Sequence, residues 1–453
     1  MTSKRILDVL PECSDTVAVE IDAGILDRAG ALFAETFPGR RAIVVADGNT
    51  WTVAGERVQA ALTAAGVETE EPYIFPGTPT LFADEHATYA LRDRLAATDA
   101  LACAVASGSL NDITKWASSL IDRPYAVVCT AASVDGYTSF GAAITVNGVK
   151  GTQECPAPRA VLAPLDIMAG APTRLTATGY GDLFEKVPAG ADWIIADELG
   201  IEAVDAHVWD LVQGPLGEAL SDPEGLTRGD LDAMTKLTDG LMMSGLAMQV
   251  HRTSRPASGA GHYFSHQWEM EGYGRDWDPP LSHGFKVGLG TLAMCALYES
   301  VLALDLTSYD IDARLADWPT PEQDRARVEA LQPNDVIRAS ASAQSAEKYL
   351  TVDQARARLE RIKVRWPAIL ERIRPQLWSA DRVETALRTV GAIHHPEQIK
   401  VSLEEFRTKY YQAQTIRTRY TVLDTLQELG LLNELVDALF APEGYWGRRP
   451  TAD

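Results

Sequence analysis

The sequence contains no apolar run long enough to cross a lipid bilayer, so we expect no transmembrane helix. Residues 1–15, MTSKRILDVLPECSD, also lack an apolar stretch that leads to a small-residue cleavage site. We therefore expect no signal peptide and a cytoplasmic protein. The remaining composition is that of an ordinary globular protein, with 46% hydrophobic and 23% charged residues, and 453 residues are enough for two or three domains.

Basic residues are too few to balance the acidic ones. The 41 Lys and Arg residues stand against 63 Asp and Glu residues, which gives a formal net charge of −22. Nucleic acids and anionic membrane surfaces carry the same sign and would be repelled, so we expect neither as a partner. A small anionic substrate remains compatible with the sequence, because a local pocket can oppose the overall charge. The charge balance therefore favours a small-molecule substrate.

Cysteine is scarce, and no Cys-x-x-Cys pair occurs. An odd number of cysteines in a cytoplasmic chain predicts free thiols that are mostly buried. We assign a catalytic role to none of the five, which are Cys13, Cys103, Cys129, Cys155 and Cys295.

Short apolar segments alternate with helical segments in the first third of the chain. The segment RAIVVA at 41–46 is continuously apolar, as are the strands of a parallel sheet that is covered on both faces. Such strands, alternating with helices of about 12 residues, are typical of βαβ units. We predict an α/β domain with a Rossmann-like parallel sheet over residues 1–165. Its strands are expected at 17–21, 41–46, 71–75, 100–105 and 125–129, and a β-hairpin is expected at 138–152 around Asn147 and Gly148.

Strand patterns nearly disappear after Asp166, and helical periodicity continues to about Ala441. Segments such as 352–364 and 368–374 are amphipathic at the spacing of a helix. We therefore predict an all-helical second domain over residues 166–453.

The usual dinucleotide motif Gly-x-Gly-x-x-Gly is absent, but residues 105–117, VASGSLNDITKWA, place Ser107, Gly108 and Ser109 between a predicted strand and a helix. Backbone N–H groups at such a helix N-terminus favour a diphosphate, and small residues allow it to approach closely. An ordinary connection between a strand and a helix is the alternative interpretation.

Two further polar segments follow predicted strands. Asp47 comes directly after the 41–46 strand, where a carboxylate can accept hydrogen bonds from ribose hydroxyls. Its charge would repel a 2′-phosphate, which favours NAD over NADP. The loop at 130–139, TAASVDGYTS, follows the 125–129 strand and is expected at the same edge of the sheet, where ligands of open α/β sheets bind. A plain turn residue and a surface loop are the respective alternatives.

Three of the eight histidines lie in residues 258–291. His262 and His266 are four residues apart and would share one face of a helix, and His283 follows after a loop. Asp182 lies within a predicted helix after Gly179, where an aspartate is unfavourable unless it has a role. Two histidines and one carboxylate would form an open, catalytic type of site, and imidazole ligands suit Zn, Ni, Fe or Cu. Chance spacing of structural histidines is the alternative.

Several stretches together resemble one family in order along nearly the whole chain. The chain is similar to sn-glycerol-1-phosphate dehydrogenases, with the bacterial type closest, in the superfamily of glycerol dehydrogenases, iron-containing alcohol dehydrogenases and dehydroquinate synthase. The resemblance implies a dehydroquinate synthase-like fold, a homodimer or larger homo-oligomer, and a metal-dependent, NAD- or NADP-linked reduction of dihydroxyacetone phosphate to sn-glycerol 1-phosphate. The stretches are 105–118, 129–152, 158–172, 178–186, 254–270, 281–291 and 415–432.

The resemblance also implies roles for individual residues. One divalent metal (Zn, Ni or Fe) would be held by Asp182, His262 and His283, and His266 and Asp135 would contact the substrate. Asp47 is the match to the ribose contact. The diphosphate loop would comprise Gly108, Ser109, Leu110, Asn111 and Asp112. The further cofactor contacts would be Thr130, Ala131, Ala132, Ser133 and Ser139.

The sequence departs from the family pattern at Ala106, Gly261, Phe285 and Pro188, which leaves the substrate less certain than the reaction class. No cluster of Lys and Arg lies near the metal motifs. A glycerol or other polyol dehydrogenase on the same scaffold is therefore an alternative. The same shortage of cations argues against a dehydroquinate synthase-type lyase or cyclase. A nucleotide-binding protein without turnover is a further alternative, which the complete metal set disfavours. The candidate phosphate-binding residues by sequence proximity are Arg159, Lys186, Arg252, Arg255 and Lys286.

Overall fold

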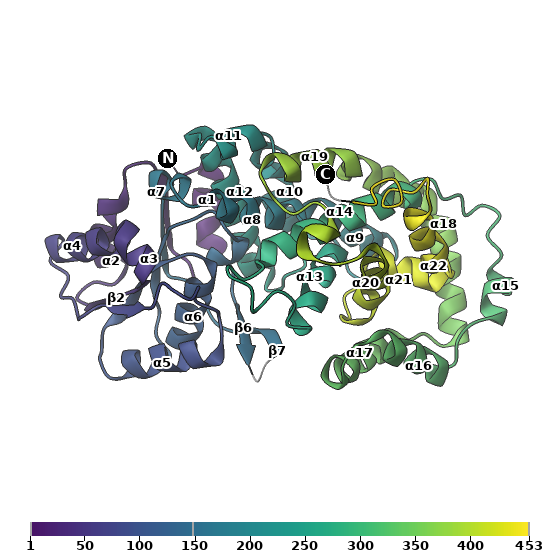
Figure 1. Ribbon diagram of the computed structural model, residues 1–453, viewed down its shortest axis with the longest axis horizontal. Coiled ribbons are helices and arrows are strands. Elements are labelled where there is room, and N and C mark those ends of the chain that lie inside the picture. Colours follow the sequence, from purple (N-terminus) through teal and green to yellow (C-terminus); the bar gives the residue numbers. More distant parts are fainter. Residues whose placement is uncertain (1, 147–148, 452–453) are drawn as a thin grey trace.

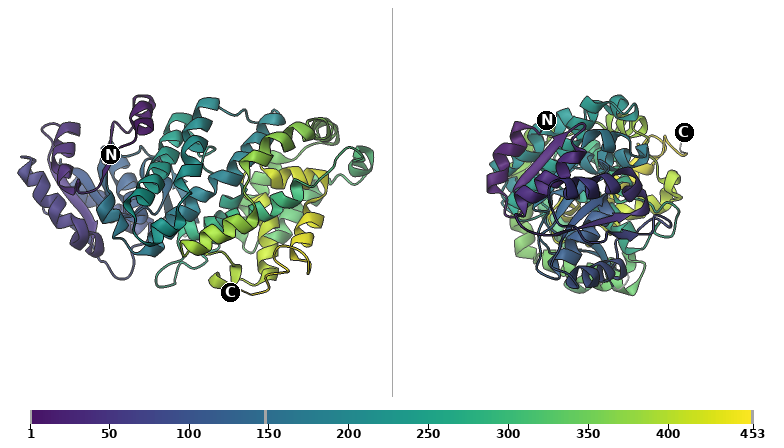
Figure 2. Two further views of the ribbon diagram at one scale, coloured as in Figure 1. Left: turned by 90° about the horizontal axis from the view of Figure 1, so that it is seen from above. Right: turned by 90° about the vertical axis from the view of Figure 1, so that its left-hand side faces the viewer.

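The computed structural model describes residues 2–146 and 149–451. A part that contains the main sheet occupies one end of the elongated molecule, and a part built of helices occupies the other (Figure 1). The view from above shows the same division (Figure 2, left). Within the described residues, no helix combines the length and the apolar character needed to cross a membrane.

Six parallel strands form the main sheet in the order β1-β8-β5-β4-β2-β3. The predicted α/β fold with a parallel sheet is confirmed, and the five predicted strands correspond to β1 to β5. The prediction missed β8, whose apolar residues are bounded by Pro158 and Pro164. The strands are Ala18–Asp22 (β1), Ala42–Asp47 (β2), Tyr73–Phe75 (β3), Leu101–Ala106 (β4), Ala126–Cys129 (β5) and Ala160–Pro164 (β8).

Side chains of the central strands alternate between two hydrophobic layers, because successive residues of a strand point to opposite faces. In β2, Val44 packs with the layer under α2 and α4, whereas Ile43 and Val45 pack with the layer under α5 and α6. Both faces are therefore buried, which explains the continuous apolar run at 41–46. The helices of this part are Lys4–Val9 (α1), Ala29–Thr36 (α2), Gly48–Thr50 (α3), Glu56–Ala64 (α4), Glu85–Ala96 (α5) and Gly108–Ser119 (α6).

The predicted hairpin is present as an antiparallel pair of strands, Ala142–Val146 (β6) and Val149–Gln153 (β7). The predicted turn residues, Asn147 and Gly148, lie outside the described residues. The loop that leads into the hairpin contains a short helical turn, Asp135–Tyr137 (η4).

Described residues after Pro164 are helical or connect helices. The helix α14 lies at the centre of this part and packs against both α8 and α13. The helices are Leu165–Ala169 (α7), Thr173–Phe184 (α8), Lys186–Glu198 (α9), Ala206–Ala219 (α10), Pro223–Thr227 (α11), Leu231–His251 (α12), Ala260–Met270 (α13), His283–Val301 (α14), Ile311–Ala316 (α15), Pro321–Leu331 (α16), Asp335–Lys348 (α17), Val352–Gln376 (α18), Ala380–Thr389 (α19), Leu403–Thr415 (α20), Val422–Leu429 (α21) and Leu432–Phe440 (α22).

Candidate metal and nucleotide site

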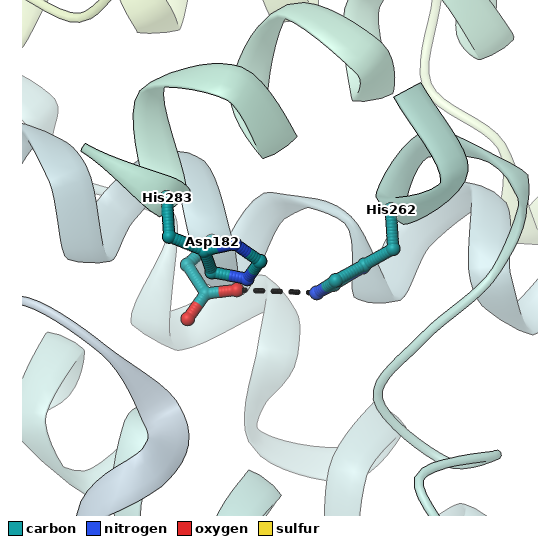
Figure 3. A group of neighbouring side chains, drawn as sticks. All are labelled: Asp182, His262 and His283. Carbon is teal, nitrogen blue, oxygen red and sulfur yellow. Dashed lines mark ion pairs between the residues drawn. The ribbon is translucent and has the colours of Figure 1, made fainter. Parts of the chain in front are cut away.

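Three helices bring one carboxylate and two imidazoles together. Asp182 lies on α8, His262 on α13, and His283 is the first residue of α14. One potential ligand atom from each residue lies within 4.8 Å of the others. The His262 Nε2 atom is 3.5 Å from Asp182 Oδ1 (Figure 3). Asp182 and His262 are buried, whereas His283 is partly exposed, so the group is accessible from one side.

A carboxylate lies beside the Nδ1 atom of each histidine of this group. His283 Nδ1 is 2.9 Å from Glu269 Oε1 and 3.0 Å from Ser265 Oγ. His262 Nδ1 is 3.8 Å from Glu185 Oε1. For His283, such a partner fixes the ring orientation and keeps the proton on Nδ1, which leaves Nε2 as the metal ligand. Within the described residues, His262 Nδ1 is buried and has no hydrogen-bond partner, and its Nε2 atom faces Asp182. The donor set and these partners fit a divalent Zn, Ni or Fe ion in an open site.

The fully buried ammonium of Lys186 joins two carboxylates at the site. Its Nζ atom lies 2.8 Å from Asp135 Oδ2 and 3.5 Å from Asp182 Oδ1, and it donates to the Asp182 carbonyl. Burial alone would raise the pKa of Asp182, but Lys186 and the two neighbouring histidines hold that pKa well below its usual range. Asp182 is therefore an anion and can serve as a ligand at neutral pH.

The loop after β5 reaches the same group of residues. The backbone N–H of Asp135 donates to Asp182 Oδ2 at 3.1 Å, and Ser244 on α12 donates to Asp135 Oδ2 at 2.8 Å. Lys115 on α6 shapes this loop, because its buried ammonium donates to three backbone carbonyls of residues 136–141. The sheet part and the helical part thus meet at Asp135.

The N-terminus of α6 offers backbone N–H groups that no side chain caps. Ser107 precedes the helix without a side-chain hydrogen bond to it, and no acidic residue occupies the first turn. A Cβ atom at Gly108 would lie 3.2 Å from Val134, so glycine keeps the loop close. Ser109 lies in the exposed first turn. This arrangement fits a diphosphate.

Several predicted cofactor contacts have side chains that are occupied within the protein. Leu110 is buried in the core, Asn111 accepts a hydrogen bond from the Tyr125 hydroxyl, and Asp112 Oδ2 lies 3.4 Å from the backbone N–H of Ala143. These residues can reach a cofactor mainly through their backbone.

The other predicted cofactor contacts are placed as follows. Ser139 donates to the Gly136 carbonyl. Asp47 Oδ1 accepts hydrogen bonds from the N–H groups of Asn49 and Thr50, so this carboxylate caps α3. Four further predicted contacts are buried in the loop after β5, namely Thr130, Ala131, Ala132 and Ser133.

Gly179 and Gly181 accommodate protein backbone. A Cβ atom at Gly179 would lie 2.1 Å from the Ala132 carbonyl oxygen, and one at Gly181 would lie 2.7 Å from the Gly284 carbonyl oxygen. The structure shows that they admit the loop after β5 and the helix α14.

His266 contacts an arginine that sequence proximity did not identify. Arg417 Nε and Nη2 each lie 3.4 Å from His266 Nδ1. Burial and then the Arg417 charge hold the pKa of His266 well below its usual value, so the ring is neutral. Because a guanidinium can only donate, Nδ1 is the acceptor and Nε2 carries the proton. The His266 ring centre is 6.0 Å from that of His262.

Four polar residues of the site were missed by the sequence interpretation. Glu185 follows Asp182 by three residues and so shares its helix face, which was a usable indication. Lys115 interrupts the apolar face of α6, which was a second one. Glu269 follows His266 by three residues on α13, which was a third one. Arg417 gave none, because its contact with His266 joins residues 151 positions apart in the chain.

Comparison with known proteins identifies relatives in sequence. The family model of iron-containing alcohol dehydrogenases matches residues 20–172. The glycerol-1-phosphate dehydrogenase (NAD(P)+) of Geobacillus thermodenitrificans is 32% identical over 318 residues, covering 64% of this chain and 77% of that protein. The enzyme of the same name from Halalkalibacterium halodurans is 36% identical over 258 residues, covering 57% of this chain and 64% of that protein. This chain therefore matches just under two thirds of the length of the Halalkalibacterium halodurans enzyme.

Solved structures share the fold at low sequence identity. Glycerol dehydrogenase from Schizosaccharomyces pombe superposes with a TM-score of 0.57 at 14% identity, covering 94% of this chain and 91% of that one. A 1,3-propanediol oxidoreductase gives a TM-score of 0.56 at 15% identity, covering 93% and 98%. These likenesses establish the two-part fold.

Proposed function

The chain belongs to the glycerol-1-phosphate dehydrogenase family, and on this premise we propose that it is a metal-dependent, NAD(P)-linked dehydrogenase that reduces dihydroxyacetone phosphate to sn-glycerol 1-phosphate. The observation that carries the proposal is the convergence of Asp182, His262 and His283, with their ligand atoms within 4.8 Å of one another. The Glu269 carboxylate behind His283 supports a metal-binding role for this group.

Asp182, His262 and His283 would hold one divalent ion, Zn, Ni or Fe. When bound, the ion would polarise the substrate carbonyl as a Lewis acid while the reduced nicotinamide supplies the hydride. The protein supplies position and electrostatics. Lys186 keeps Asp182 ionised and fixes Asp135 beside it.

His266 and Asp135 are the proposed substrate contacts. The neutral His266 ring carries its proton on Nε2 and donates it in a hydrogen bond to the substrate oxygen that gains negative charge. Asp135 is held through Oδ2 by Lys186 and Ser244, which orients its other oxygen to accept a hydrogen bond from a substrate hydroxyl.

The N-terminus of α6 is the proposed diphosphate site, with Gly108, Ser109 and the following residues contributing backbone N–H groups. Thr130, Ala131, Ala132, Ser133 and Ser139 would line the neighbouring cofactor site. Asp47 at the end of β2 would contact the ribose and favour NAD over NADP. Family membership further supports a cytoplasmic homodimer or larger homo-oligomer as a proposal, which size-exclusion chromatography with light scattering tests.

An assay of NADH oxidation by metal-reconstituted protein tests the function. Dihydroxyacetone phosphate and dihydroxyacetone are compared side by side, and we expect preference for the phosphorylated ketone. Preference for dihydroxyacetone would indicate a polyol dehydrogenase instead, and turnover of neither would refute the proposed activity. His262→Ala should lose both metal and activity, whereas His266→Ala should retain the metal and lose activity. Metal analysis of both variants separates the two roles.

A further inference from the structure

We propose that Arg417 binds the phosphate group of the substrate. This inference rests on the dehydrogenase function proposed above and names the residue that selects a phosphorylated ketone. Arg417 lies in the loop at 416–421 between α20 and α21, and its guanidinium contacts His266, the proposed hydrogen-bond donor to the substrate. A phosphate one carbon away from the reacting carbonyl would extend from the metal group towards this side of His266.

Most hydrogen-bond donors of Arg417 have no partner in the part of the chain that the structure describes. A guanidinium has five N–H donors in a planar fork that can bind a phosphate through two parallel hydrogen bonds. Within the described chain, Arg417 makes two long hydrogen bonds, both to His266 Nδ1, and no ion pair with a carboxylate. Burial also lowers the pKa of Arg417. A desolvated cation without an anion is costly, and a bound phosphate would remove that cost.

The cations proposed from sequence proximity are engaged elsewhere. Lys186 is held by Asp135 and Asp182, and Arg255 donates to the carbonyls of Tyr420 and Asp192 and pairs with Glu202. Arg252 donates to Ser14, and Arg159 donates to the Asp15 carbonyl at the opposite edge of the sheet. Lys286 is buried within α14.

The charge of the site requires a cation for an anionic substrate. Four carboxylates lie at the metal group, and one of them is the ligand Asp182. Their combined charge of −4 exceeds the charge of +3 that Lys186 and one divalent ion would supply together. A phosphate approaching this group without a further cation would be repelled. Arg417 supplies that charge at the rim of the group, beside His266. The four carboxylates belong to Asp135, Asp182, Glu185 and Glu269.

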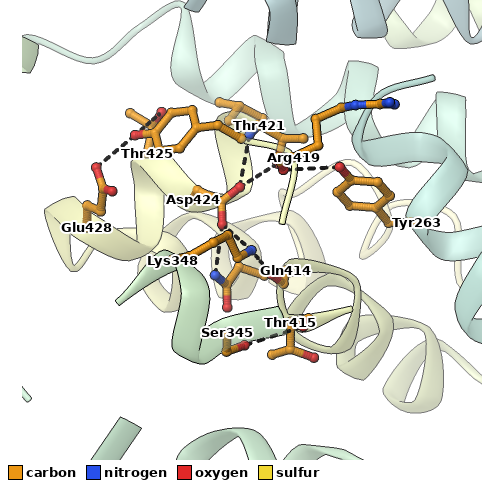
Figure 4. Close-up of polar contacts among 12 residues, drawn as sticks. Tyr263, Ser345, Lys348, Gln414, Thr415, Arg419, Thr421, Asp424, Thr425 and Glu428 are labelled. Carbon is orange, nitrogen blue, oxygen red and sulfur yellow. Dashed lines mark hydrogen bonds and ion pairs between the residues drawn. The ribbon is translucent and has the colours of Figure 1, made fainter. Parts of the chain in front are cut away.

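Hydrogen bonds brace the loop at 416–421, which carries Arg417, both within the loop and at the two helices that flank it (Figure 4). On one side, the Tyr263 hydroxyl donates to the Arg419 carbonyl at 3.1 Å. On the other, Lys348 donates to the Gln414 carbonyl and to Asp424, both at 2.6 Å. Such bracing reduces the entropy lost when a ligand binds, so Arg417 is positioned in advance.

The neighbouring arginine of the same loop has a different role. Arg419 donates to the Ser258 carbonyl at 2.8 Å and to Ser254 Oγ at 2.9 Å, so it fixes the segment that leads into α13. Its guanidinium is therefore engaged by the protein, and Arg417 alone of the two remains available for a ligand.

Replacement of Arg417 by glutamine tests the proposal with both ketones. Glutamine can still donate a hydrogen bond to His266, so the change removes mainly the charge and the fork. We expect the ratio of kcat/KM for dihydroxyacetone phosphate to kcat/KM for dihydroxyacetone to fall roughly 10- to 100-fold, the loss of a charge-assisted phosphate contact, because any effect that acts through His266 changes both ketones alike. For Arg417→Lys, the preference for the phosphorylated ketone should lie between those of the wild type and Arg417→Gln, because lysine keeps the charge but lacks the planar fork. Arg159→Gln is the matched control and should match the wild type.

Titration calorimetry of inorganic phosphate with the metal-loaded proteins gives a readout without turnover. Wild-type protein and Arg159→Gln should bind phosphate, and Arg417→Gln should bind it at least about tenfold more weakly. If Arg417→Gln keeps both the wild-type preference for the phosphorylated ketone and the wild-type phosphate affinity, the assignment of Arg417 is wrong while the proposed function stands. If wild-type protein reduces neither ketone, the function is wrong, and the calorimetry still decides whether Arg417 binds phosphate.

Discussion

At the scale of single residues, Gly261 shows how the environment of a metal ligand is built. A Cβ atom at this position would lie 2.1 Å from Glu185 Oε2, so glycine makes room for a buried carboxylate next to His262. Glu185 also accepts hydrogen bonds from the His262 N–H and from Thr291. A carboxylate thus reaches this histidine from the end of α8.

A second buried glutamate should make stability depend on pH. Glu428 accepts a hydrogen bond from the Tyr420 hydroxyl and lies 3.2 Å from Arg358, with Asp424 and Lys348 also nearby. Burial, opposed by Arg358, raises its pKa from 4.5 to about 7. Because the folded state then binds the proton more tightly than the unfolded chain, stability from this group falls as pH rises from about 4.5 to 7.

Glu428→Gln removes this proton linkage. The measured quantity is the difference in unfolding free energy, wild type minus variant. This difference should be on the order of 2 kcal/mol smaller at about pH 7.5 than at about pH 5. Urea unfolding followed by tryptophan fluorescence at both pH values measures it. The same difference at both values would show that Glu428 has an ordinary pKa.

Residue roles were predictable from the sequence where they depend on local spacing. His262 and His266 lie one helical turn apart, and the structure places both beside His283. Arg417 was not predictable, because its contact with His266 joins residues 151 positions apart. For Asp47, the sequence pattern could not distinguish two roles. A carboxylate after a strand is suited both to a ribose contact and to the helix cap that the structure shows.

At the scale of elements, glycines allow the three metal-bearing helices to approach one another. A Cβ atom at Gly284 on α14 would lie 2.0 Å from the Thr178 carbonyl of α8, and one at Gly290 would lie 2.2 Å from the Gly261 carbonyl of α13. These contacts set the separations of Asp182, His262 and His283. Glycine here serves helix packing, which offsets its unfavourable helix propensity.

Gly290→Ala should therefore separate α13 from α14 without altering a ligand. We expect a loss of about 1–3 kcal/mol in stability, as for an overpacked core, together with weaker metal binding. Gly217→Ala in α10 is the control, because a Cβ atom there meets nothing within 4 Å. This control should be neutral or stabilised by up to about 1 kcal/mol. Urea unfolding and metal titration of both variants measure the effects. Equal unfolding free energies and equal metal affinities in the two variants would show that α14 can shift to accommodate the added methyl group at little cost.

Element types were predicted best where the sequence pattern was long or continuous. Strands β2 and β4 were found because both their faces are buried, which produces uninterrupted apolar runs. Strand β8 was missed because its four apolar residues before Pro164 follow closely on Pro158 and resemble a connecting segment. Its pairing with both β1 and β5 is a long-range contact that no local pattern records.

At the scale of the whole molecule, the site joins both parts of the chain. Asp135 of the sheet part donates its N–H to Asp182 of the helical part, and Thr138 donates to the Met242 carbonyl of α12. The division into a sheet part and a helical part was predictable from the change of periodicity near Asp166. Their contact at Asp135 was not, because it depends on tertiary packing.

A metal ion held by three helices should stabilise the whole molecule. The ligands converge only in the folded chain, so binding adds RT ln(1 + [L]/Kd) to stability, about 2.7 kcal/mol at a hundredfold excess over Kd. Chelation should lower the Tm of wild-type protein by a few degrees without unfolding it, because Lys186 still neutralises part of the charge on Asp182. His262→Ala should show the same Tm with and without chelator. Calorimetry after readdition of Zn, Ni or Fe identifies the ion that restores the wild-type Tm, and a wild-type Tm unaffected by all three ions would count against a metal site at these residues.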